Sequence, residues 1–159
     1  MKEEMSRIVR TITSLIYGFV IIYGFYIIVH GHLTPGGGFQ GGAIVASAFA
    51  LLLVSYGEKG IDGFLKEELL SYIESTGLVL FISFAFLGLG TTFFYNFLAN
   101  SENIFGNSVN TGINPGELNS SGTIALMNIA VGIEVLAALG VIILNMSAGA
   151  EKISKQKEN

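Results

Sequence analysis

Residues 11–29 read TITSLIYGFVIIYGFYIIV and contain no charged side chain. A helix needs about 20 apolar residues to cross the roughly 30 Å hydrocarbon core of a bilayer. Four stretches of the chain meet this requirement, and none shows the alternation of a membrane strand. The sequence therefore predicts an all-α integral membrane protein, multi-pass in the cell membrane. Its four predicted transmembrane helices are about residues 9–29, 36–56, 75–98 and 123–146.

The composition supports a membrane class and excludes several others. Half of the chain is hydrophobic (51%) and only 13% is charged, whereas soluble domains carry about 25% charged residues. With no cysteine and two histidines, we expect neither a metal site nor a cofactor. No basic cluster is interleaved with aromatics, so nucleic-acid binding is not predicted. We expect one membrane domain over residues 1–159, surrounded by lipid and by other subunits, with an outer loop at about 97–122.

The positive charges indicate the orientation. All eight fall in the N-terminus, the loop between the second and third spans, and the C-terminus. The loops at about 30–36 and 96–122 contain none. Cytoplasmic loops are enriched in Lys and Arg, so both termini are predicted to be cytoplasmic.

A glycine run opens the second span. Residues 35–42 read PGGGFQGG, and Gly36, Gly38 and Gly41 have the G-x-G-x-x-G spacing of a dinucleotide-binding turn. That turn needs a preceding strand and an acidic residue about 20 positions on, in a soluble βαβ unit. Here a membrane helix precedes it and another follows, so no nucleotide is expected.

The run has a mechanical interpretation instead. Pro35 suits the first turn of a helix. Gly37 with Gly41, and Gly38 with Gly42, form two G-x-x-x-G pairs that let a neighbouring helix approach closely. Gln40 is a polar group among them. If the glycines are not helical, the second segment is re-entrant rather than spanning.

Glu134 is the first candidate for ion chemistry, because it lies near the middle of the fourth span. An ionised residue at this depth costs about 2.5–3.5 kcal/mol on insertion scales. It must therefore be protonated, paired or next to water. A proton or cation relay is the interpretation we favour, and a hydrogen bond to another subunit for assembly is the alternative.

Four further polar residues are weaker candidates. Asn128 suits an interhelical hydrogen bond, and it need not share a site with Glu134. His30 and His32 either shuttle protons at the outer end of the first span or cap that end. Glu74 completes a capping box with Ser71, or it guards a cytoplasmic entrance.

The string GHLTPGGGFQGGAIVAS, which follows one membrane helix and opens another, resembles the B subunit of Mrp-type multisubunit sodium/proton antiporters. The same module recurs in archaeal membrane-bound hydrogenase and sulfane-reductase complexes, and the fourth span looks closer to these. The resemblance implies a non-redox subunit, not an enzyme by itself, in an assembly that translocates Na⁺ or H⁺. Alternatives are a purely structural subunit and the B subunit of a stand-alone antiporter.

Overall fold

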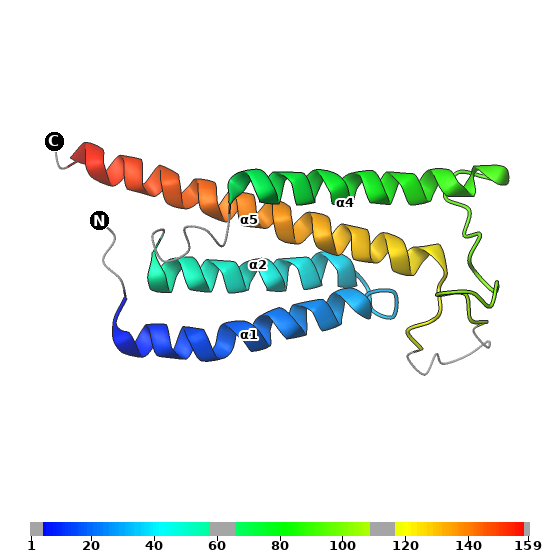
Figure 1. Ribbon diagram of the computed structural model, residues 1–159, viewed down its shortest axis with the longest axis horizontal. Coiled ribbons are helices and arrows are strands. Elements are labelled where there is room, and N and C mark those ends of the chain that lie inside the picture. The colour runs from blue at the N-terminus through cyan, green and yellow to red at the C-terminus, as the bar shows by residue number, and fades with distance from the viewer. Residues whose placement is uncertain (1–4, 58–65, 109–116, 158–159) are drawn as a thin grey trace.

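The computed structural model describes residues 5–57, 66–108 and 117–157 (Figure 1). Within these ranges the chain forms four long helices and no strand. Each helix is long and apolar enough to cross a membrane, which confirms the predicted all-α class with four candidate spans. The helices are α1 (Arg7–Val29), α2 (Gly37–Tyr56), α4 (Glu67–Leu87), which the short 3-10 turn η1 (Gly88–Gly90) follows, and α5 (Thr123–Lys157).

The four helices lie in a row rather than a closed bundle (Figure 1). Helix α1 packs on α2, α2 on α5, and α5 on α4, while α1 meets α5 at only a few residues. Accordingly, 17% of the apolar part of α1 is buried within the chain, against 44% for α2. Such a row leaves two broad faces for lipid or for neighbouring subunits.

Helix α2 begins two residues after Pro35, so the predicted placement of this proline in the first helical turn is wrong. Gly36 is the N-cap and adopts a left-handed φ of 74°, which glycine tolerates without strain. From Gly37 onward the glycine run is helical, and α2 has 20 residues. The structure therefore shows a full-length helix and not a re-entrant segment.

Helix α4 begins and ends earlier than the predicted 75–98. Two glutamates in its first turn favour the positive end of the helix dipole at Glu67, so Ser71 and Glu74 lie inside the helix and form no capping box. The helix ends where the chain folds back tightly. A Cβ on Gly88 would lie 2.6 Å from the Tyr95 nitrogen, and Phe94 adopts a φ of 65°.

Helix α5 continues to Lys157, well past the predicted end at residue 146, because no proline interrupts it. At its other end Asn96, from the segment that follows η1, caps the helix. The side-chain oxygen of Asn96 accepts hydrogen bonds from the Thr123 nitrogen (2.8 Å) and hydroxyl (2.9 Å). The Asn96 amide donates to the Ser121 carbonyl at 2.9 Å. Asn96 is thus fixed to the start of α5.

Candidate functional site

Asn128 joins three helices at one point, which we call the Asn128 junction. Its side-chain oxygen accepts from the Gly38 nitrogen in the first turn of α2, at 2.8 Å. Its amide donates to the Ile28 carbonyl near the end of α1, at 2.7 Å. Helix starts leave backbone N–H groups without intrahelical partners, and Asn128 satisfies one of them. The geometry supports the structural role favoured for this residue.

The two G-x-x-x-G pairs face different helices. A Cβ on Gly37 would collide with the backbone of Gly31, and one on Gly41 would lie 2.7 Å from the Gly24 carbonyl of α1. The second pair faces α5: a Cβ on Gly38 would lie 2.5 Å from the Asn128 carbonyl, and one on Gly42 would lie 2.8 Å from that of Gly132. One run of sequence therefore lets α2 contact both neighbours at backbone distance.

The exposed members of the run lie apart from these contacts. Pro35, Gly36 and Gln40 are exposed, and Phe39 is 59% exposed. The Gln40 side chain lies near Gly36: a Cβ on Gly36 would lie 3.6 Å from the Gln40 amide nitrogen. These residues therefore lie on the outer surface of the row, where lipid or another subunit can reach them.

Glu134 lies on the opposite side of α5, against α4. A Cβ on Gly77 would lie 2.8 Å from the Glu134 nitrogen and 2.9 Å from its Cβ. The glutamate is half-buried. Among the described residues, its carboxylate has no hydrogen-bond partner or ion pair. Glu134 thus lies where α4 and α5 pack at backbone distance, and its carboxylate has no counter-charge among the described residues.

Two further carboxylates of α4 lie along the same contact. Leu70 packs on Gly140 of α5, and Glu74 lies four residues after Leu70 and three before Gly77, which places it on the same helix face. Glu67, one more turn toward the helix start, accepts a hydrogen bond from the Asn145 amide at 3.1 Å.

We call this contact the α4–α5 seam: Glu67, Leu70, Glu74 and Gly77 of α4 facing Glu134, Gly140 and Asn145 of α5. Glu67 and Glu74 are about 10 Å apart along the helix axis, and Gly77 is about 5 Å further. Glu67 and Glu74 thus form a line of carboxylates that leads from the start of α4 toward Glu134. Sequence reasoning missed Glu67 because the third helix was predicted to start at 75, and so it did not pair Glu67 with Asn145. The seven-residue spacings from Glu67 to Glu74 and from Leu70 to Gly77 carried the signal.

The two histidines lie in the connection between the end of α1 and the start of α2. His30 donates from Nδ1 to the Tyr26 carbonyl at 2.9 Å, and its ring lies 4.0 Å from that of Tyr26. His32 donates from Nε2 to the Glu117 carbonyl at 3.3 Å, while its buried Nδ1 has no partner among the described residues. Since α1 and α4 are the two ends of the row, neither histidine joins the α4–α5 seam.

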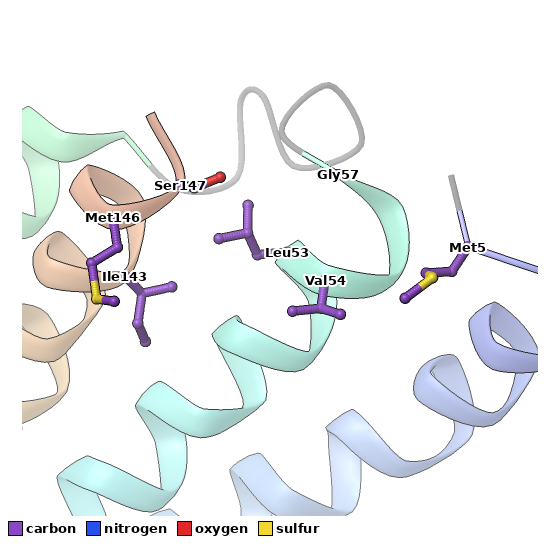
Figure 2. A pocket seen from close by; sticks show the side chains of 7 residues that line it. All are labelled: Met5, Leu53, Val54, Gly57, Ile143, Met146 and Ser147. Atoms are coloured by element: carbon purple, nitrogen blue, oxygen red, sulfur yellow. The ribbon is translucent and has the colours of Figure 1, made fainter. Parts of the chain in front are cut away.

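One cavity among the described residues is lined mostly by apolar side chains and does not suit an ion. It has a volume of about 470 Å³ and lies where α2 ends, beside α5 and the segment before α1 (Figure 2). Ser147 supplies the one side-chain hydroxyl among the residues that Figure 2 labels. In the described part of the chain, no three His, Asp or Glu side chains gather as metal ligands do.

Four apolar helices with buried polar contacts between them define a multi-pass membrane protein. A family model described as a domain related to the MnhB subunit of Na⁺/H⁺ antiporter matches residues 8–141. The chain belongs to this family, which confirms the resemblance carried by the glycine run.

Individual relatives agree with the family. An uncharacterized protein of Methanocaldococcus jannaschii is 32% identical over 161 residues, which cover 98% of this chain and 58% of that protein. The B-type subunit of the Na⁺/H⁺ antiporter of Bacillus subtilis is 35% identical over 82 residues, which cover 50% of this chain and 57% of that relative.

A solved structure extends the likeness to the fold. A chain of the membrane-bound sulfane sulfur reductase, an archaeal respiratory membrane complex, matches with a TM-score of 0.71 and 30% identity. The match covers 92% of this chain and 60% of that one. The matched regions therefore cover 57–60% of the length of these three relatives.

Proposed function

We propose that this chain is a non-redox membrane subunit of a sodium/proton-translocating complex, and that its α4–α5 seam forms one wall of the ion path. The observation that carries the proposal is Glu134, a carboxylate at mid-span that the described chain leaves without a partner. Burying such a group costs about 2.5–3.5 kcal/mol, and intramembrane ionisable residues usually face a partner or a water-filled path.

The direction of the path follows from the carboxylates and from the positive charges. Arg7 begins α1, Lys66 is the N-cap of α4 and Lys152 lies near the end of α5. These three helix ends lie toward the same side of the molecule (Figure 1). By the positive-inside rule this side is cytoplasmic, together with both termini. Glu67 and Glu74 then lead from the cytoplasmic side to Glu134, so the seam is a half-path that ends near the membrane centre.

The row architecture assigns the other wall of the path to a neighbouring subunit. A single layer of helices encloses no pore, because each helix has two open faces. The fold match and the 30% identity to a respiratory complex favour an assembly of that kind over a stand-alone antiporter. The subunit composition of the detergent-extracted complex separates the two, since metal-binding redox subunits occur only in the first.

Replacing Glu134 by Gln in the assembled complex tests the relay. The substitution keeps size and hydrogen bonding but removes the ionisable proton, so we expect ion pumping by membrane vesicles to fall at least ten-fold. Glu68→Gln is the matched control, since Glu68 is exposed, lies in the first turn of α4 and is not part of the seam. A native gel verifies that both complexes assemble.

Two results would reject the relay. Unchanged pumping by an assembled Glu134→Gln complex would show that the carboxylate does not conduct ions. Loss of assembly, with normal pumping by the residual intact complex, would assign Glu134 to subunit contact. The second result would favour the structural alternative, which the Asn128 junction and the close glycine contacts also suit.

A further inference from the structure

The uncharged stretch that follows Glu74 is longer than the helix that it forms. The next charged residue in the sequence is Glu102, yet α4 ends at Leu87. After η1 the chain turns back along α4 instead of leaving for water. We call the segment that turns back the fold-back; it comprises residues 91–97, which read TTFFYNF.

The fold-back places aromatic rings against the last turns of α4. Phe93 packs edge-on against Phe86, with ring centroids 5.3 Å apart, and Phe94 lies 6.1 Å from Phe81. Phe93 and Phe94 also contact each other at 4.5 Å. These four rings form one connected surface, which we call the aromatic patch. Much of it faces outward, since Phe86 is 54%, Phe93 49% and Phe94 51% exposed.

Contacts on two sides of α5 give the height of the aromatic patch relative to the other helices. A Cβ on Gly42 of α2 would lie 2.8 Å from the Gly132 carbonyl, and one on Gly77 of α4 would lie 2.8 Å from the Glu134 nitrogen. Gly42 and Gly77 are therefore at about the same height. At about 1.5 Å per residue, α2 starts about 7.5 Å from Gly42, whereas α4 continues about 15 Å beyond Gly77. The end of α4 thus passes the start of α2, as Figure 1 shows.

This offset places the fold-back at the boundary of the bilayer. The 20 residues of α2 measure about 30 Å, which is the thickness of the hydrocarbon core. The headgroup layer adds roughly 5–7 Å on each side, and the end of α4 extends about that far beyond α2. Asn96 agrees with this height, because it bonds Thr123 at the start of α5. Aromatic side chains are enriched in this layer of the membrane.

The backbone of the fold-back is suited to contact with lipid. Hydrocarbon offers no hydrogen bonds, so a non-helical segment beside it must satisfy its own polar groups. Four backbone nitrogens of the fold-back donate to carbonyls of the same region: those of Thr91, Phe94, Tyr95 and Phe97. A segment that already uses these donors does not need a strand from another subunit to pair with it.

We infer that the aromatic patch and the fold-back anchor the chain in the lipid leaflet on the side where α4 ends. The phenylalanine rings lie against the upper parts of the acyl chains, and Tyr95, which is 47% exposed, lies at the level of the headgroups. The anchor fixes the height of α4 in the bilayer. The inference does not depend on the ion path, because it uses only the helix offsets and the aromatic contacts.

Tryptophan fluorescence of the full chain in nanodiscs tests the anchor, because the chain contains no tryptophan of its own. Phe93→Trp places a single emitter in the aromatic patch. Lipids brominated either beside the ester groups or near the chain ends then report its depth. We expect a blue-shifted emission that the bromines beside the ester groups quench more strongly. Phe19→Trp is the matched control, since Phe19 is 74% exposed near the middle of α1 and should be quenched more by the deep bromines.

Three outcomes would overturn the inference. The same depth profile for Phe93→Trp and Phe19→Trp would place the patch deep in the bilayer. Red-shifted emission that aqueous iodide quenches would place it in water. In the assembled complex, benzoylphenylalanine replaces Phe93, and photo-crosslinking to another subunit would assign the patch to a protein contact, whereas crosslinks to lipid alone support the anchor. Phe97→Trp, at a side chain that is 40% exposed in the same fold-back, repeats the depth measurement if Phe93→Trp does not fold.

Discussion

Gly31 and Asn128 should be energetically coupled, because the structure leaves no room for a methyl group between them. A Cβ on Gly31 would lie 2.6 Å from both Cγ and Oδ1 of Asn128. All three of its nearest atoms belong to this one side chain. The Gly31→Ala change therefore forces the Asn128 side chain to rotate away from the Asn128 junction.

Rotation breaks both hydrogen bonds of the junction, to the Gly38 nitrogen and to the Ile28 carbonyl. Interhelical hydrogen bonds in membranes contribute about 0.6 kcal/mol on average and up to about 1.7. Two of them amount to about 1–3 kcal/mol of unfolding free energy. Asn128→Ala removes the same two bonds and should cost a similar amount. Once Asn128 is alanine, the three atoms nearest to the new Cβ are gone, so we expect Gly31→Ala to cost little more.

The double-mutant cycle is measured by unfolding the purified chain with sodium dodecyl sulfate in mixed micelles, followed by circular dichroism. The expected coupling free energy is about 1–3 kcal/mol. Gly18→Ala is the control, since no heavy atom lies within 4 Å of a Cβ there. It should leave stability unchanged or raise it by up to about 1 kcal/mol, and it should be additive with Asn128→Ala. Strict additivity of Gly31→Ala with Asn128→Ala would refute the geometry of the junction.

Two further predictions concern polar contacts, one at the start of α5 and one between α1 and α2. Asn96→Ala removes the side-chain acceptor of Thr123, so it should lower stability by about 0.5–2 kcal/mol and speed hydrogen exchange in the first turn of α5; unchanged exchange there would contradict the capping role. Thr13 and Ser55 share a buried hydrogen bond of 2.6 Å between α1 and α2. Thr13→Val alone should cost about 1–2 kcal/mol by leaving the Ser55 hydroxyl unpaired, while adding Ser55→Ala should recover part of this. A double variant that is less stable than Thr13→Val would refute the pairing.

The spans could be predicted from the sequence because a membrane requires length and apolarity, and both are visible along the chain. The close-contact role of PGGGFQGG was also predictable, since only small residues allow backbones to approach. The spacing did not reveal which helix each pair contacts: one glycine pair faces α1 and the other faces α5. The two contacts depend on the position of α2 between α1 and α5, which no local sequence pattern encodes.

The start of α4 was misplaced for a different reason. Charged residues were taken as boundaries of the spans, yet a helix that leaves the bilayer continues into water when its residues favour it. Glu67 and Glu74 therefore belong to the helix and to the α4–α5 seam. In the same way, the end of the helix at Leu87 depends on the fold-back of Phe94 and Tyr95 over Gly88, a tertiary contact that hydropathy does not report.

The two halves of the row are built for different purposes. Helices α1, α2 and α5 meet through glycine backbones and through the hydrogen bonds of the Asn128 junction. The α4–α5 seam also closes tightly at Gly77, yet it contains Glu134 at mid-span, and an isolated subunit in lipid would have to bury this carboxylate at a cost of about 2.5–3.5 kcal/mol. A row that is rigid on one side and ionisable on the other fits a subunit whose seam is completed by another chain. Isolated from its complex, this chain should therefore be least stable at α4, and hydrogen exchange there should slow on assembly while that of α1 and α2 stays constant.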